Sequence, residues 1–257
     1  MRIPRLLLAT VAAFLCFAVV AVAQTTQYDV RGSVTVTGGS KKKPKPGGLT
    51  FGFTVTDPAG TQPPPLQTYK IGFEGGRMNL SLMKACPAAK INAANGGDDK
   101  VCPKGSLIGS GTLKAVVGGT GQPLGDALPC DAKLRLYAAG SKAAALFVDA
   151  PLATCPAEIH QAIPMNYFTE GAVAGLEFTV PQELRHQIGL DVTVVNTDVT
   201  LPKVVKTIKK KVGHKKKKVK VGFLESTGCS DGQRDLVVTF TDEQGGSHPV
   251  TKTLGKC

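Results

Sequence analysis

The stretch from Lys203 to Cys229 reads KVVKTIKKKVGHKKKKVKVGFLESTGC and is the most unusual part of this sequence. Ten of its first eighteen residues are lysine, yet apolar residues recur between the lysines, at Val204, Val205, Ile208, Val212, Val219, Val221 and Phe223. This mixture is too apolar for a solvated tail and too basic for an ordinary core strand. The pattern predicts a β-hairpin with a charged tip that leads into Cys229.

The first 23 residues have the three parts of a secretory signal peptide. Two arginines supply positive charge, the run from Leu6 to Val22 is almost wholly apolar, and Ala21–Ala23 is a small-x-small cleavage site. We therefore expect a signal peptide at residues 1–23 and a mature chain, residues 24–257, that is secreted to the extracellular space. An uncleaved anchor is the alternative, because the apolar run is about as long as a short membrane span. The mature chain has no second run of that length, so we expect no transmembrane anchor in it.

The basic character of the mature chain is local. Its 29 basic and 19 acidic residues give a net charge of +10. Fourteen of the basic residues are lysines in two tracts, one from Lys41 to Lys45 and the other from Lys203 to Lys220. The first tract separates two strand-like runs, Tyr28–Thr37 and Leu49–Thr56, and is expected at the tip of another hairpin. Charge concentrated in two tracts favours a binding patch over charge that is spread across the surface to keep the protein soluble.

The lysine tracts are the strongest functional signal. The candidate polyanion-binding residues are Lys209, Lys210, Lys211, Lys215, Lys216, Lys217, Lys218, Lys220, Lys41, Lys42, Lys43 and Lys45. Lysine meets phosphate as a point charge, and neither tract contains arginine, so we expect no specific recognition of nucleic acid. The expected partner is an anionic cell-envelope polymer or surface. The competing interpretation is structural: the lysines keep the domain soluble and protect an exposed strand edge.

Six cysteines remain in the mature chain: Cys86, Cys102, Cys130, Cys155, Cys229 and Cys257. An even number in an exported chain indicates disulfide bonds, with fifteen possible connectivities. Pairing of neighbours (86–102, 130–155 and 229–257) is the first expectation, because each pair brackets a loop or hairpin. No Cys-x-x-Cys or Cys/His pair has zinc-ligand spacing, so the sequence predicts neither a metal site nor a cofactor. It leaves the oligomeric state open.

Strand-like patterns dominate the mature chain. Period-2 and β-branched runs bounded by glycine and proline recur, and the clearest is Leu190–Leu201, LDVTVVNTDVTL. Roughly a dozen such runs predict an all-β fold, an antiparallel β-sandwich in a single domain. Pro87 and the alanine-rich residues after it predict one short helix near residues 87–95. A subdivision near residues 118–126 is the alternative.

Catalytic patterns are missing from the sequence. None of the four histidines has a neighbour at metal-ligand spacing, and Gly109–Gly111 lacks the Gly-x-Ser-x-Gly of a nucleophile elbow. A glycosidase needs two acids that face one cleft, whereas Asp149, Glu158, Glu170 and Glu177 are scattered along the chain. We therefore expect no enzymatic activity. The alternative is a β-sandwich hydrolase acting on an extracellular polymer.

Aromatic residues make up 5% of the sequence, and tryptophan is absent. Six phenylalanines lie within strand patterns and are expected in the core: Phe51, Phe53, Phe147, Phe178, Phe223 and Phe240. The scarcity of aromatic side chains argues against carbohydrate recognition on exposed rings. It also argues against binding of single-stranded nucleic acid by base stacking.

Two stretches carry a resemblance to known proteins. From Cys102 the chain reads Cys-Pro-Lys-Gly-Ser-Leu-Ile-Gly-Ser-Gly-Thr, and another Cys-Pro pair begins at Cys86. Glu225–Cys229 reads Glu-Ser-Thr-Gly-Cys. These motifs resemble those of uncharacterised secreted, β-rich, disulfide-containing proteins of actinobacterial type. The resemblance implies secretion and a disulfide framework, and it assigns no activity to any residue.

Overall fold

The computed structural model describes residues 26–212 and 215–257. The signal peptide expected at residues 1–23 lies outside the described residues. The strands are β1 (Gln27–Val34), β2 (Lys45–Gly47), β3 (Leu49–Thr56), β4 (Leu66–Glu74), β5 (Gly76–Met78), β6 (Leu107–Gly118), β7 (Leu128–Ala138), β8 (Ala143–Ala150), β9 (Ile159–Glu170), β10 (Val173–Thr179), β11 (His186–Gln187), β12 (Leu190–Leu201), β13 (Val205–Val212), β14 (Lys215–Gly222), β15 (Leu224–Ser226), β16 (Gln233–Asp242) and β17 (Ser247–Lys256). The helices are α1 (Ala88–Asn92), α2 (Gln182–Arg185) and the single 3₁₀ turns η1 (Leu80–Leu82), η2 (Asp99–Val101) and η3 (Leu124–Asp126).

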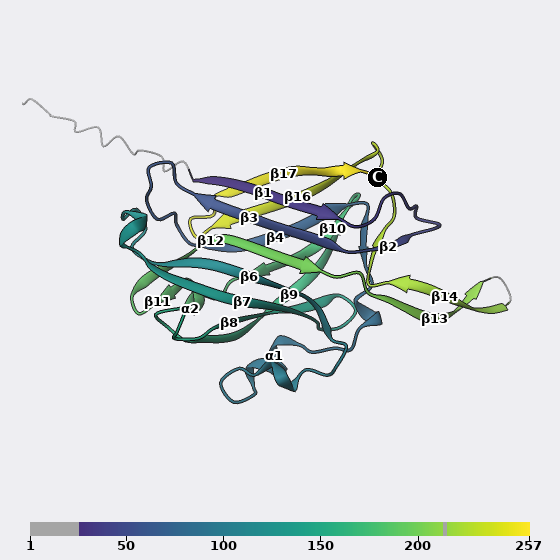
Figure 1. The fold of residues 1–257 in the computed structure, drawn as a ribbon, viewed down its shortest axis with the longest axis horizontal. Helices are drawn as coiled ribbons and strands as arrows, with labels where there is room; N and C mark the ends of the chain where they lie inside the picture. The colour runs from purple at the N-terminus through teal and green to yellow at the C-terminus, as the bar shows by residue number, and fades with distance from the viewer. Residues whose placement is uncertain (1–25, 213–214) are drawn as a thin grey trace, which may run out of the picture.

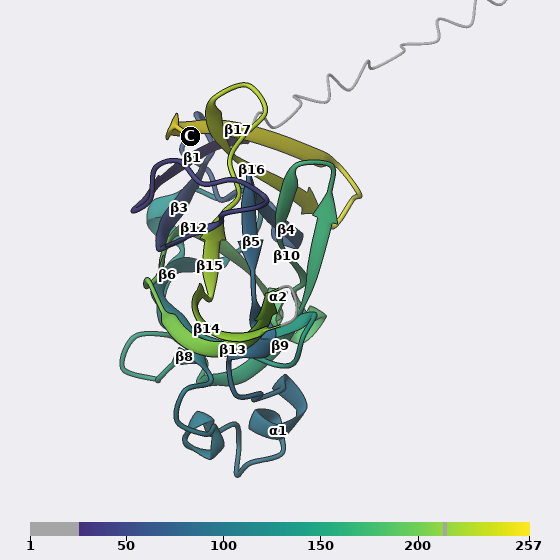
Figure 2. The same ribbon diagram turned by 90° about the vertical axis from the view of Figure 1, so that its right-hand side faces the viewer.

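One large antiparallel sheet makes up most of the molecule, which confirms the predicted all-β fold. Its strand order is β1-β3-β12-β6-β7-β8-β9-β10-β4-β16-β17, and β11 pairs with the start of β12. The sheet curls until β17 lies alongside β1 (Figures 1 and 2). There the ring of Tyr28 stacks on His248, with ring centroids 4.9 Å apart. The architecture is therefore intermediate between a sandwich and a closed barrel.

Most of the core lies inside this curled sheet. All six phenylalanines predicted to be core residues are buried. Phe53, Tyr69, Phe178 and Phe240 form a chain of ring contacts between β3, β4, β10 and β16, with centroid separations from 5.1 to 5.9 Å. Such aromatic pairs add to the stabilisation that burial of apolar surface provides. They hold together strands that lie far apart in the sequence.

A β-bulge in β12 decides which of its side chains face the core. The register against β6 shifts between Val194 and Asn196. The extra residue reverses the alternation of the strand. Because of this change, Thr197 joins Val199 and Leu201 on the inner face. Asn196 and Asp198 then face outward, where Arg31 binds both side chains.

A small subdomain covers the outer face of β7, β8 and β9 (Figures 1 and 2). It contains α1, which confirms the helix predicted near residues 87–95. Its core is formed by Ile91, Tyr137, Phe147 and neighbouring alanines and cysteines. The side chain of Asn92 both accepts from the Ala162 amide at 2.7 Å and donates to the Ala162 carbonyl at 2.9 Å. The Asn92 side chain thereby gives hydrogen-bond partners to the backbone amide and carbonyl of Ala162 in β9.

All three predicted disulfide bonds are confirmed: Cys86–Cys102, Cys130–Cys155 and Cys229–Cys257. The first closes the α1 subdomain, the second ties the loop after β8 to β7, and the third joins the segment before β16 to the residue after β17. The segment 118–126 connects β6 to β7, which are neighbours in the large sheet.

Candidate functional site: the lysine end of the barrel

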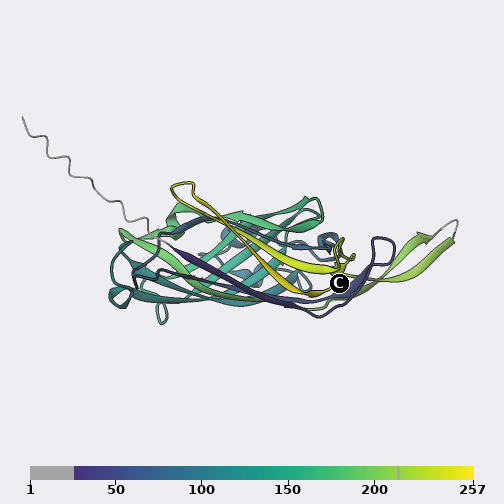
Figure 3. The same ribbon diagram turned by 90° about the horizontal axis from the view of Figure 1, so that it is seen from above.

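The strands β13 and β14 form a separate two-stranded sheet, here called the lysine hairpin. It projects beyond the end of the large sheet (Figures 1 and 3). The predicted hairpin is thus confirmed, with turn residues 213–214 outside the described residues. A two-stranded ribbon alone is only marginally stable in water. Contacts at its base therefore have to hold it.

Phe223, the residue after β14, anchors that base. Its side chain is fully buried. Its amide donates to the Val204 carbonyl at 2.8 Å, and its carbonyl accepts from the Asn79 amide at 2.7 Å. One residue earlier, a Cβ atom on Gly222 would lie 2.7 Å from the Cβ of Pro46. Only glycine fits this close approach, which presses the hairpin base against β2.

A buried carboxylate completes the anchor. Glu225 is 2% exposed, and it accepts hydrogen bonds from the Gly222 amide at 2.9 Å and the Asn79 side chain at 3.0 Å. It also forms an ion pair with Arg77. Burial alone would raise the pKa of Glu225, but the hydrogen bonds from Arg77 and Gly222 outweigh it and lower the pKa. This carboxylate is therefore engaged at the base and does not neutralise the lysines.

Lysines lie directly opposite one another along the hairpin. The register places Lys209 opposite Lys218, Lys210 opposite Lys217 and Lys211 opposite Lys216. Like charges at directly opposite positions destabilise an antiparallel pair. Nearer the base, the apolar pair Ile208 and Val219 offsets part of this repulsion. The hairpin thus concentrates positive charge at some cost to its own stability.

The hairpin lysines face solvent. The described side chains of Lys209, Lys216, Lys217, Lys218 and Lys220 are exposed. In contrast, Lys206 donates to the Leu82 carbonyl at the base. Within residues 26–212 and 215–257, the ion pairs involve Arg31, Lys70, Arg77, Arg135, Arg185 and three histidines, and none of the exposed hairpin lysines.

The second lysine tract lies at the same end of the molecule (Figures 1 and 3). Ser40 and Lys43 exchange two backbone hydrogen bonds of 3.1 Å, which close a tight turn with exposed Lys41 and Lys42 at its tip. The tract then enters β2, where Lys45 lies opposite Ser226 of β15. Because β15 directly continues the lysine hairpin, the fold brings together two tracts that are about 160 residues apart.

The acidic residues that appear scattered in the sequence are partly gathered by the fold. Asp149 and Glu158 both contact His160, at 2.9 and 3.0 Å. Arg135 binds Asp149 at 3.0 Å and also pairs with Asp99. This cluster lies on the outer face of β7, β8 and β9, beside the α1 subdomain. Asp99 and Asp149 pair with the Arg135 guanidinium, and Glu158 contacts His160, so each carboxylate of this cluster has a partner.

A shallow concavity of about 680 Å³ on the outer face of β1, β3, β12 and β6 was not anticipated. A row of hydroxyl residues crosses it in register: Ser33, Thr50, Thr200 and Ser110. Gly32, Gly52 and Gly111, from three of these same strands, also line it. No sequence motif marks such a row, because each strand contributes a single side chain.

The described part of the chain contains no helix long and apolar enough to cross a membrane. In the same residues, no group of three histidine, cysteine, aspartate or glutamate side chains is placed to hold a metal ion. Comparison with known proteins gives no match to a family model, to a curated protein or to a solved structure.

Proposed function

We propose that this protein is secreted and acts without catalysis, as an extracellular interaction protein whose lysine hairpin binds anionic polymers. The observation that carries the proposal is the register of β13 and β14, which sets three pairs of lysines against one another. A negatively charged chain lying along the ribbon converts this mutual repulsion into attraction. The bound polymer would also release its condensed counterions, which makes such binding strong at low salt.

The shape of the hairpin suits a flexible polymer. An eight-residue strand is about 26 Å long, so the ribbon offers several successive contacts to one chain. The exposed turn with Lys41 and Lys42 extends the basic surface at the base. Recognition would depend on charge density alone, because lysine provides point charges without fixed bidentate geometry. Phosphate-bearing cell-envelope polymers have the required chemistry.

Two further features support the wider proposal. Three disulfide bonds are typical of proteins in an oxidising compartment, which favours secretion. The carboxylates around His160 and Arg135 all contact one of these two side chains. Their arrangement therefore gives no positive reason to choose the hydrolase alternative.

Binding of inorganic polyphosphate across a potassium chloride series tests the proposal. The variant with Lys209, Lys216, Lys217 and Lys218 replaced by Gln removes four exposed charges from the hairpin. The slope of log affinity against log salt is expected to fall by roughly 0.7 for each phosphate that the variant no longer neutralises. The matched control replaces four exposed lysines elsewhere with Gln: Lys90, Lys100, Lys114 and Lys133.

The control variant has the same net charge as the hairpin variant. It therefore distinguishes contact between the polymer and the hairpin lysines from attraction to the net positive charge of the protein. It is expected to keep the salt slope of the unmodified protein. An equal fall in slope in both variants would show that binding follows net charge and would contradict the proposal. If the hairpin variant keeps its affinity but self-associates, the lysines protect a strand edge instead.

A further inference from the structure

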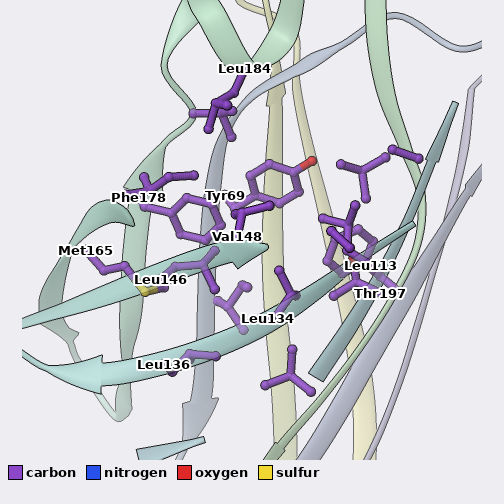
Figure 4. Close-up of a pocket in the computed structure, with 18 of the residues that line it drawn as sticks. Tyr69, Leu113, Leu134, Leu136, Leu146, Val148, Met165, Phe178, Leu184 and Thr197 are labelled. Atoms are coloured by element: carbon purple, nitrogen blue, oxygen red, sulfur yellow. The ribbon is translucent and has the colours of Figure 1, made fainter. Parts of the chain in front are cut away.

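The interior of the curled sheet contains a cavity of about 100 Å³. Its wall consists almost entirely of apolar side chains from eight strands and α2 (Figure 4). A barrel of about eight strands has an interior that side chains just fill or that holds one small ligand. The path of this sheet contains eleven strands. The greater width explains why the apolar side chains leave space between them.

A smaller cavity of about 20 Å³ adjoins the first. Four residues line both cavities and so separate them: Phe51, Ile71, Leu136 and Met165. Methionine is unbranched and adapts its shape easily. Movement of Met165 would therefore join the two spaces without displacing a strand.

Two hydroxyl groups interrupt the apolar lining, those of Tyr69 and Thr197 (Figure 4). Thr197 is 4% exposed, and its hydroxyl oxygen has no hydrogen-bond partner among the described residues. Thr193 on the same strand is different, because its hydroxyl donates to the Pro63 carbonyl at 2.6 Å. A buried hydroxyl without a partner destabilises the folded protein, because it has lost its hydrogen bonds to water. A cavity occupant with one hydrogen-bonding group would remove that destabilisation.

Beside the cavity, β9 and β10 are paired over only part of the length of β9. The two strands pair only from Asn166 to Glu170 and from Val173 to Glu177. Beyond this pairing the chain leaves β10 and forms the single turn α2, whose Leu184 closes the cavity at one end (Figure 4). A four-residue helix therefore covers the gap that a continuous strand pair would otherwise close.

Side-chain contacts hold α2 over this gap. Gln161 of β9 donates to Glu183 at 3.0 Å, which bridges the gap directly. Arg185 pairs with Glu243 in the turn between β16 and β17. His186 contacts Glu243 at 2.7 Å and Asp191 at 3.0 Å. Such contacts break and re-form more easily than a ladder of backbone hydrogen bonds.

We propose that the barrel interior binds a small, mainly apolar molecule with one hydrogen-bonding group, of the size of a single aromatic ring, and that the molecule enters past α2. Apolar cavities of about 150 Å³ bind benzene, and the two adjoining spaces together approach that size. The free hydroxyl of Thr197 selects ligands that carry a polar atom. This site is independent of the lysine hairpin.

Titration of the full chain with phenol and with benzene, followed by calorimetry and by the NMR shifts of core methyl groups, tests the proposal. Phenol is expected to bind about tenfold more tightly than benzene. Thr197→Val keeps the shape of the side chain and removes the hydroxyl. It is expected to abolish the preference for phenol and to raise the thermal unfolding midpoint of the unliganded protein. Thr200→Val, on the exposed face of the same strand, is the control and should change neither property.

Absence of saturable binding of either probe to the unmodified protein overturns the proposal, as does a phenol preference that survives Thr197→Val. Access past α2 has a separate test. Gln161→Ala removes the exposed contact that bridges β9 and α2, and it is expected to speed the association and release of benzene several-fold with unchanged affinity. Unaltered exchange rates would contradict the route past α2.

Discussion

At the hairpin end of the molecule, Lys209 lies opposite Lys218 and neither has an ion-pair partner within the described residues. At the α2 end, Arg185 pairs with Glu243, while His186 lies between Glu243 and Asp191. The first arrangement gathers charge of one sign in solvent. The second pairs Arg185 with an acid from another part of the chain and places His186 between two carboxylates.

The comparison distinguishes two roles of charged side chains. Those around α2 stabilise the fold, whereas the hairpin lysines remain available to bind a partner. The contacts of Arg185 and His186 with acidic side chains hold α2 in place, and these groups already have partners within the protein. Opposed lysines destabilise their own ribbon, so the protein keeps the hairpin only because its base is firmly anchored. Three measurements on stability test this comparison, in order of decreasing expected effect.

The anchor of the hairpin should be the most sensitive position. Glu225→Ala leaves the Arg77 guanidinium, the Asn79 side chain and the Gly222 amide without their buried acceptor. The Arg77 side chain is 42% exposed and can be hydrated, so the main cost comes from the hydrogen bonds that lose their buried acceptor, about 1–3 kcal/mol. A decrease of that size in the free energy of unfolding, measured with urea, is expected.

The matched control is Asp198→Ala, which breaks the ion pair with Arg31 on the outer face. Asp198 is 56% exposed, and surface pairs contribute about 0–1 kcal/mol. A decrease below about 1 kcal/mol is therefore expected. Equal decreases in the two variants would mean that Glu225 contributes no more than a surface charge.

Acid should weaken the α2 end. Burial acts to raise the pKa of Asp191, but hydrogen bonds from Thr120 and His186 outweigh it and lower the pKa below its ordinary value of 3.8. A depressed pKa in the folded state gives stability that is present above pH 3.8 and is lost as pH falls through the folded-state pKa. The contribution of Asp191 to the free energy of unfolding should therefore decrease as pH falls below 3.8.

Asp191→Asn isolates this contribution. At pH 7 the variant is expected to be less stable by on the order of 1 kcal/mol, because the site is only partly buried. The difference between the two proteins should shrink as pH falls below 3.8, because protonation of Asp191 removes the charge that Thr120 and His186 bind. A stability difference that stays constant from pH 7 to pH 2 would show that the charge of Asp191 is irrelevant.

Local patterns account for the parts of the fold that the sequence predicts well. The lysine hairpin, the short helix after Pro87 and the neighbour disulfides are all formed by residues close together in the chain. The strand Leu190–Leu201 is predicted with its observed bounds, because β-branched residues fill it. The alternation of apolar residues and the spacing of the cysteines predict these local features directly.

Features assembled across strands were beyond sequence reasoning. The inward position of Thr197 depends on a bulge after Val194, and nothing in LDVTVVNTDVTL marks where an extra residue interrupts the ladder. The convergence of Asp149 and Glu158 on His160 depends on the register of β8 and β9. The proximity of the two lysine tracts requires the pairing of β2 with β15.

The smallest expected effect concerns the opposed lysines themselves. Lys218→Glu turns the repulsive pair with Lys209 into an attractive one. Cross-strand charge pairs contribute roughly 0.2–1 kcal/mol, so the slowing of amide hydrogen exchange in β13 and β14 should be modest. The expected gain is confined to the hairpin, because β13 and β14 form a sheet of their own.

Lys220→Glu makes the same change in charge opposite Thr207, where no lysine is directly paired. Its effect on exchange should be smaller than that of Lys218→Glu, and both effects should fade at about 1 M salt, where charges more than about 3 Å apart are screened. Equal slowing in the two variants would mean that the total charge of the hairpin matters and the opposition of Lys209 and Lys218 does not. Slower exchange in Lys218→Glu together with weaker polyphosphate binding would show that the same lysine pair destabilises the hairpin and attracts its ligand.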